Sequence, residues 1–132
     1  MKKKGHFVAE AAVLIPAVCV LLVQLVFFTL YVHDYAVCRH AAIESGIKGS
    51  YPDGRTDRRR EYEIREDLER KLQERLLWMQ DPEVEAEVNP VQMVIRIKGA
   101  GNFLPVDEIE VRQKIFRIKP CESVRRSRWL KG

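Results

Sequence analysis

The sequence predicts an α+β protein in which a long N-terminal transmembrane helix is followed by a small extracytoplasmic domain of one amphipathic helix and a three-stranded antiparallel sheet. Three observations lead to this prediction. A run of 22 uncharged residues, Ala11 to Val32, follows a basic N-terminus. Apolar residues then recur at helical spacing between residues 57 and 80, and an alternation of polar and apolar residues begins at Glu83.

The uncharged run predicts a helix that crosses a membrane. Its 22 residues rise about 33 Å in an α-helix, which is enough to span the hydrocarbon core. A cleaved secretory signal would have a shorter apolar core followed by a small-residue cleavage site, and none follows Val32. Residues 33–43 are compatible with a helix, so we expect the helix to continue to about Ser45. Gly46 and the glycines and proline of residues 49–54 are expected to end it.

The charges that flank the run predict its orientation. Three lysines, Lys2, Lys3 and Lys4, precede it, which favours a cytoplasmic N-terminus. A domain as long as residues 33–132 is translocated largely regardless of its charge. The sequence therefore predicts a single-pass protein of the cell membrane with its C-terminal domain extracytoplasmic.

A second helix is expected from Thr56 or Asp57 to Gln80. Its predicted buried stripe consists of residues three or four positions apart, namely Tyr62, Ile64, Leu68, Leu72, Leu76 and Met79. The remaining faces alternate in charge, as is typical of a solvated helix. The three arginines at positions 58–60 are closely followed by acidic residues, so no nucleic-acid partner is predicted.

The next residues predict an antiparallel hairpin. Val84, Ala86 and Val88 alternate with glutamates, and the apolar residues between Val91 and Ile97 alternate with Gln92, Arg96 and Lys98. Asn89-Pro90 is typical of a turn. The acidic face of the first strand is expected to pair with the basic face of the second.

A third strand is expected over residues 108–118, after a break at Gly99–Asn102. Its alternation shifts near Gln113, which predicts a β-bulge. Three strands bury too little apolar surface alone, so the second helix is expected to cover the sheet. The sequence leaves open whether the first helix also packs on the sheet or stays a bare stalk.

A single carboxylate, Glu10, stands at the start of the apolar helix. An ionised side chain in a membrane is costly, so such a residue is expected to have a positive partner. A peptidase that cut after Gly5 would leave a chain that begins at His6, with Glu10 as its fifth residue. In a bundle of such chains, Glu10 of one subunit could face the N-terminal ammonium of the next. That pair would offset the desolvation of both charges and set their register.

These residues resemble the class III signal of type IV pilins and pseudopilins, which has a basic leader, a glycine and a glutamate at the fifth mature position. The segment Val8 to Pro16 is similar to the TadE-like pseudopilin family of tight-adherence (Flp-type) pilus systems. Tyr35, Ala36, Ala41, Ala42 and Gly46 also fit the end of the long helix of that family. The resemblance covers about the first 50 residues. Many pilins carry Phe as the first mature residue, whereas this chain has His6 followed by Phe7.

The resemblance implies a pilin-like fold and a minor pilin or pseudopilin that functions in pilus assembly, cell adhesion or secretion. It implies a leader (residues 1–5), a transmembrane helix (6–32), a helix extension and linker (33–50) and a small extracytoplasmic α+β domain (51–132). The implied partners are a prepilin peptidase, other pilins or pseudopilins, the pilus assembly platform and membrane lipids. The alternative function is a single-pass membrane-anchored adaptor with an extracellular interaction domain and no pilus role.

The remaining reactive residues predict no chemistry. No nucleophile–base pair, phosphate-binding loop or metal cluster stands out, so the chain is expected not to be an enzyme and to bind no cofactor, metal or small-molecule substrate. Cys38 and Cys121 are both expected in a compartment where disulfides persist, and a bond between them or two free thiols are both compatible with the sequence.

Overall fold

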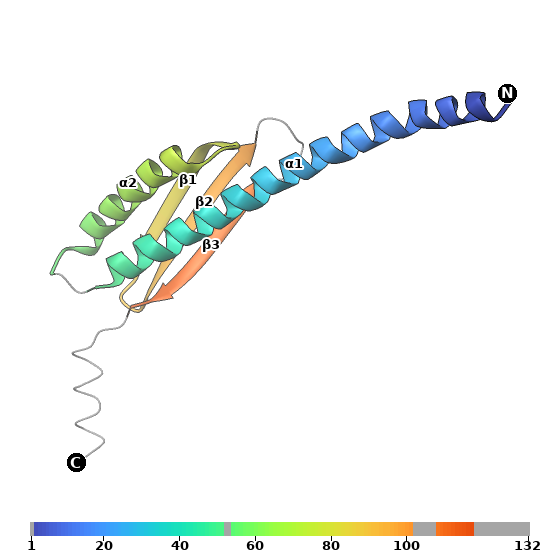
Figure 1. Ribbon diagram of the computed structural model, residues 1–132. Coiled ribbons are helices and arrows are strands. Elements are labelled where there is room, and N and C mark those ends of the chain that lie inside the picture. The colour runs from blue at the N-terminus through green and yellow to red at the C-terminus, as the bar shows by residue number, and fades with distance from the viewer. Residues whose placement is uncertain (1, 52–53, 102–107, 118–132) are drawn as a thin grey trace, which may run out of the picture. The chain divides into compact units, whose positions relative to one another are not determined.

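The computed structural model describes residues 2–51, 54–101 and 108–117, and it divides the chain into two compact units. The first unit is residues 1–33, and the second, which we call the sheet unit, is residues 34–132. The α+β prediction is confirmed, because a long N-terminal helix, a second helix and a three-stranded antiparallel sheet follow one another along the chain (Figure 1).

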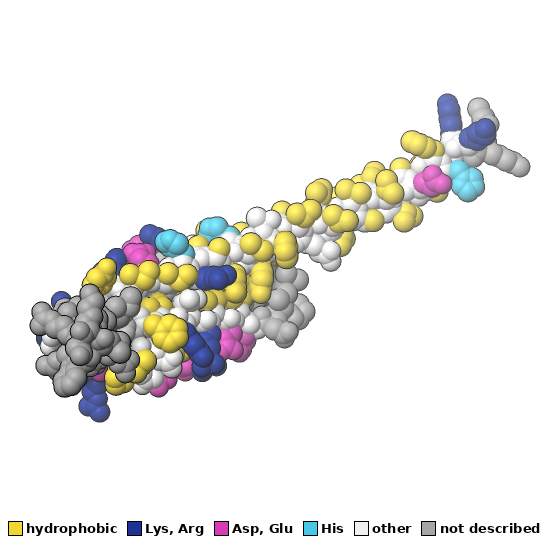
Figure 2. Space-filling model, turned by 90° about the horizontal axis from the view of Figure 1, so that it is seen from below, with side chains coloured by type: hydrophobic (Ala, Val, Ile, Leu, Met, Phe, Trp, Pro, Cys, Tyr) yellow, Lys and Arg dark blue, Asp and Glu magenta, His cyan; other side chains and the backbone are white. Residues whose placement is uncertain are grey.

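The first unit consists of the N-terminal part of helix α1 (Lys2–Ser50). Its apolar side chains are exposed, including Leu14, Leu21 and Phe28 at 59–66%. Figure 2 shows these hydrophobic side chains as an unbroken band along the helix. The helix is long and apolar enough to cross a membrane, and it continues through Pro16.

The prediction that the helix ends at about Ser45 is wrong, because α1 continues to Ser50. Gly46 and Gly49 do not end the helix. They lie within it, where side chains of the sheet and of the second helix pack against their backbone. A Cβ atom at Gly46 would lie 1.7 Å from Cδ1 of Ile115, and one at Gly49 would lie 2.5 Å from Cδ1 of Ile64. The second half of α1 therefore packs on the sheet and is not a bare stalk.

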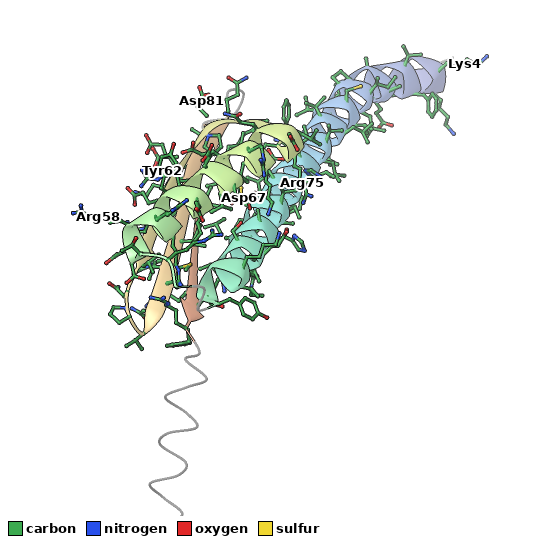
Figure 3. All side chains as sticks on the ribbon, turned by 90° about the vertical axis from the view of Figure 1, so that its left-hand side faces the viewer. Lys4, Arg58, Tyr62, Asp67, Arg75 and Asp81 are labelled. Carbon is green, nitrogen blue, oxygen red and sulfur yellow. The ribbon has the colours of Figure 1, made fainter. Side chains whose placement is uncertain are left out.

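Helix α2 (Asp57–Arg75) begins where the sequence predicts and ends earlier. Thr56 is its N-cap residue. Its C-cap residue is Leu76, whereas the sequence predicts a helix that continues to Gln80. The buried stripe is Ile64, Leu68 and Leu72, together with Arg60. Tyr62 is 68% exposed, so its predicted place in the core is wrong (Figure 3).

The sheet is a meander of β1 (Met79–Val88), β2 (Gln92–Gly101) and β3 (Ile109–Phe116), in the order β1-β2-β3. The predicted turn at Asn89-Pro90 is confirmed by a hydrogen bond from Asn89 N–H to the carbonyl oxygen of Gln92, at 2.9 Å. The predicted pairing of charged faces is also confirmed. Glu85 lies opposite Arg96 in the register, with a 3.5 Å ion pair between them.

Both β1 and β2 extend beyond their predicted ends. Asp81-Pro82, which directly follows the predicted end of the second helix, lies within β1 at a register irregularity between Gln80 and Glu83. Gly99 and Gly101 do not break β2, because the absence of their side chains makes room for larger neighbours. A Cβ atom at Gly101 would lie 1.9 Å from the Trp78 ring, and one at Gly99 would lie 2.3 Å from the Met79 sulfur.

The bulge predicted near Gln113 is wrong, because β3 pairs with β2 without a register shift from Ile109 to Phe116. Ile109, Val111, Gln113 and Ile115 lie on the face beneath the helices, and Phe116 is 70% exposed. The sequence alternation shifts only because the apolar Phe116 lies on the charged face of the sheet. Residue 118 of the predicted strand lies outside the described residues.

The core of the sheet unit lies between one face of the sheet and two helices. Figure 1 shows α2 in front of β1 and the second half of α1 in front of β2 and β3. Its fully buried side chains include Leu68 and Leu72 of α2 and Met93, Ile95 and Ile97 of β2. The opposite face carries mostly charged residues, and no helix of the described part of the chain covers it.

Candidate functional site

The proposed processing segment lies at the exposed start of α1. Residues 3–10 are all exposed, and a Cβ atom at Gly5 would have no neighbour within 4 Å. His6 and Glu10 are four residues apart in a continuous helix, so both side chains lie on one face. Figure 2 shows basic, acidic and histidine side chains gathered at this end, beside the hydrophobic band. The Gly5–His6 bond is therefore accessible, and Glu10 lies one helical turn from it.

Glu10 makes no hydrogen bond or ion pair with any residue that the structure describes. Its only near neighbours in the sequence that carry a positive charge are the lysines of the leader. Removal of residues 1–5 would take those lysines away and create an ammonium group at His6. A carboxylate in this position is thus available for a positive group supplied from outside the chain.

A buried carboxylate, Asp34, organises the start of the sheet unit. Its side chain is 0% exposed and lies two residues after the end of the apolar run. Its Oδ2 atom accepts hydrogen bonds from the backbone N–H groups of Trp78 and Met79, both at 2.8 Å, and its Oδ1 atom accepts one from Leu77 at 3.1 Å. Asp34 therefore joins α1 to the connection between α2 and β1.

The three amides that donate to Asp34 lie where the chain passes from α2 to β1. Helix and sheet hydrogen bonds do not satisfy all the backbone N–H groups of this connection. Helix α2 has ended at Leu76 and β1 begins at Met79, so neither ladder takes up all the N–H groups between them. Buried backbone N–H groups require an acceptor, and a carboxylate with two oxygens can accept several at once. This geometry makes Asp34 a structural anchor for residues 34–50 of α1.

Small residues allow α1 to lie close to the sheet beyond Asp34. Cys38, Ala41, Ala42 and Ser45 are 0–2% exposed, and they repeat at intervals of three or four along one face of the helix. Gly46 and Gly49 continue the same face. We call this set the small-residue face. Because it carries little bulk, the apolar side chains of β2 and β3 can fill the space between helix and sheet.

The Cys38 thiol is buried on this face and bonds to no other cysteine of the described residues. Burial raises its pKa from 9.0 to about 11, and the nearby Asp34 carboxylate adds to the shift. A thiol with so high a pKa is a poor nucleophile at neutral pH. Its predicted disulfide partner, Cys121, lies outside the described residues, so the bond between them stays a prediction.

An ion-pair network joins the C-terminal part of α1 to α2. Lys71 of α2 lies 3.1 Å from Glu44 of α1 and 2.8 Å from Asp67, and Lys48 lies 2.8 Å from Glu44. Figure 3 shows Asp67 on the flank of α2 that faces α1. The hydrogen bonds from Lys48 and Lys71 lower the pKa of Glu44 from 4.5 to about 2, and Lys71 also lowers the pKa of Asp67.

Acidification is expected to weaken the contact between the two helices. Glu44 and Asp67 have lower pKa values in the folded than in the unfolded chain, so their stabilisation is complete above about pH 4.5 and is lost as the pH falls toward 2. Replacing Lys71 by glutamine should therefore flatten the decline of the melting temperature between about pH 5 and pH 2. Thermal denaturation followed by circular dichroism measures this difference. Arg58→Gln, a change at an exposed arginine of α2 that lies outside this network, is the control that should keep the wild-type slope.

The sequence predicts a role for Gly5, His6 and Glu10, which stays a prediction, and it gives no role to Asp34. One signal was available, because Asp34 is the first carboxylate after the apolar run and stands four residues before Cys38 on the small-residue face. Its partners could not be found in this way, since Leu77, Trp78 and Met79 were assigned to the second helix. The sequence therefore does not predict the connection between α2 and β1 that supplies the three amides.

The chain was also compared with known proteins. No family model, no curated protein and no solved structure matches it. The structure alone thus describes an α+β protein with one N-terminal helix that is long and apolar enough to cross a membrane.

Proposed function

We propose that this protein is a minor pilin or pseudopilin that takes part in assembling a type IV pilus of the Flp or Tad type, or a related secretion filament. The observation that carries the proposal is the placement of Gly5 and Glu10. They stand between a basic tip and an exposed, uncharged helix, and Glu10 has no partner among the described residues. This is the arrangement expected of a class III signal followed by an assembly helix.

The proposed reaction is a cleavage of this chain by a prepilin peptidase. Hydrolysis of the Gly5–His6 amide releases residues 1–5 and leaves a protonated amine on His6. In an assembly of membrane helices, Glu10 of one subunit then pairs with the His6 ammonium of another pilin or pseudopilin. Opposite charges in hydrocarbon attract strongly because each is costly alone, and the pair sets the axial register of the two helices.

The sheet unit supports the proposal by its architecture. A long N-terminal helix that leads to a small antiparallel sheet is similar to the architecture that the resemblance to pilins implies. Asp34 and the small-residue face attach the sheet to the part of α1 that follows the apolar run. A subunit built in this way would carry its sheet unit outside the membrane while the apolar helix joins the assembly platform and other subunits.

Pro16 is compatible with a helix that must leave the bilayer during assembly. A proline has no N–H group, so the carbonyl four residues earlier, at Ala12, lacks its helical hydrogen bond. The local loss of one bond lowers the cost of bending α1 within the membrane. This property adds to the proposal without being specific to it, because transmembrane helices often tolerate proline.

The proposal predicts that the mature chain begins at His6 only when a prepilin peptidase is present. The full chain would be expressed with and without the peptidase, and its N-terminal residue determined by intact mass and terminal sequencing. Gly5→Val should block the cleavage, since the larger side chain occupies the position before the cut bond. A chain that begins at Met1 under both conditions would favour the membrane-anchored adaptor instead and would overturn the pilin assignment.

A further inference from the structure

The two edges of the sheet differ in their ability to accept another strand. The β1 edge is interrupted by Asp81, which has a φ of 44°, by Pro82, and by the register irregularity between Gln80 and Glu83. Such bulges and prolines block the pairing of a further strand. The β3 edge has none of these features, since β3 pairs with β2 in an unbroken register and contains no proline. Within the described residues, no strand covers it.

The backbone groups that face this open edge can be identified from one hydrogen bond. The N–H group of Arg117 donates to the carbonyl oxygen of Val91 at 2.9 Å, so Arg117 points toward the β2 side of the sheet. Backbone direction alternates along an antiparallel strand. The odd-numbered residues of β3 therefore bond to β2, and the even-numbered residues, with Glu108 just before the strand, present their N–H and C=O groups to the open edge.

The even-numbered residues carry an ordered set of charges. Four of the five are charged, namely Glu108, Glu110, Arg112 and Lys114, and the fifth is Phe116 at the end of β3; all five are exposed. The order is two negative charges followed by two positive charges, with Val111 at the centre. Neither Arg112 nor Lys114 makes an ion pair with a described residue. Glu110 lies 3.3 Å from Arg96 and remains half exposed, so it can accept a second cation.

This order is self-complementary when β3 pairs with a second copy of itself in antiparallel orientation. A two-fold axis at Val111 places Glu110 opposite Arg112 and Glu108 opposite Lys114, and the symmetry repeats both pairs. The neighbouring registers each place like charges opposite one another. A shift of the axis to Glu110 or Arg112 makes that residue face its own copy, and an axis at Gln113 places Arg112 opposite Lys114. Opposite charges stabilise a cross-strand pair and like charges destabilise it.

We propose that β3 is a homodimerisation edge, at which two copies of this chain join their sheets into one six-stranded antiparallel sheet about a two-fold axis at Val111. The interface is isologous, as is usual for symmetric dimers. Its backbone hydrogen bonds supply affinity, and its four charge pairs select the register. The proposal does not depend on the pilin assignment, because it concerns only the sheet unit.

The test measures the mass of the protein in detergent solutions of the full chain, by sedimentation or light scattering over a range of concentrations. The wild type is expected to dimerise. The acidic variant (Arg112→Glu with Lys114→Glu) and the basic variant (Glu108→Lys with Glu110→Lys) should each dimerise at least about tenfold more weakly, since all four pairs become repulsive. An equal mixture of the two variants should form a heterodimer. The chain carrying all four changes should recover the homodimer.

A matched control makes the same change of charge at the other edge, with Glu83→Lys and Glu87→Lys on β1, and should leave dimerisation unchanged. Circular dichroism melting of each variant checks that it is folded. A monomeric wild type would overturn the proposal. So would folded acidic and basic variants that dimerise as well as the wild type, because association would then come from the apolar helix. A failure of the fourfold variant to dimerise would also overturn the register at Val111.

Discussion

Replacing Asp34 by alanine is expected to destabilise the sheet unit by about 3 kcal/mol, which is a large fraction of the stability of a small domain. The variant leaves the N–H groups of Trp78 and Met79 buried without the acceptor that now lies 2.8 Å from each. An unsatisfied buried donor loses its water without regaining a hydrogen bond, which costs about 1–3 kcal/mol for each group. Chemical denaturation of the full chain in detergent, followed by tryptophan fluorescence, measures the change.

Two further variants separate the hydrogen bonds from other effects. Asp34→Asn keeps the shape of the side chain and one acceptor oxygen. Its free energy of unfolding should therefore lie between those of the wild type and Asp34→Ala. Asp81→Asn is the matched control at an exposed aspartate with a positive φ, a conformation that asparagine tolerates, and it should change stability by less than about 0.5 kcal/mol. Wild-type stability of Asp34→Ala would contradict the assignment of this residue as the anchor of α1.

Replacing Glu10 by alanine is expected to abolish the incorporation of the chain into the filament while leaving cleavage after Gly5 intact. The carboxylate is exposed and lies just before the uncharged run of α1, outside the sheet unit, so its removal leaves the folded sheet unit unchanged. Only the pair with the ammonium of a neighbouring subunit is lost, and with it the charge that sets the register. The measurement compares the amount of mature chain in isolated filaments with the amount that remains in the membrane.

The controls for Glu10 test charge and position separately. Glu10→Asp keeps the charge and should retain part of the incorporation, whereas Glu10→Gln should behave like alanine. Glu66→Ala removes an exposed carboxylate from α2 and should have no effect. If Glu10→Ala chains enter filaments normally after cleavage, the register mechanism is wrong, although the processing of the chain would still stand.

The end of α2 cannot be predicted from the local sequence pattern. Leu76 and Met79 continue the three- and four-residue spacing of α2, so periodicity alone extends that helix to Gln80. The chain instead turns at Leu77 and Trp78, because Asp34 accepts their amides and Gly101 leaves room for the Trp78 ring. Both causes lie more than 20 residues away in the sequence, and local patterns contain no information about them.

Glycine was misread for a related reason. Gly46, Gly99 and Gly101 were expected to end a helix and a strand, since glycine weakens both kinds of element. In the structure all three lie within their elements, where a neighbouring side chain occupies the space that a Cβ atom would need. A glycine required for close approach and a glycine that ends an element look the same in one sequence.

The sequence by itself determined the features that depend on local periodicity and on charge. These are the apolar helix with its basic start, the positions of Gly5 and Glu10, the beginning of α2 at Thr56, and the paired acidic and basic faces of β1 and β2. Only the tertiary structure decided that α1 covers the sheet through its small-residue face, that Asp34 holds the start of β1, and that β3 has the open edge. Those features depend on contacts between distant residues, whose energies exceed the local preferences of glycine and of a helical pattern.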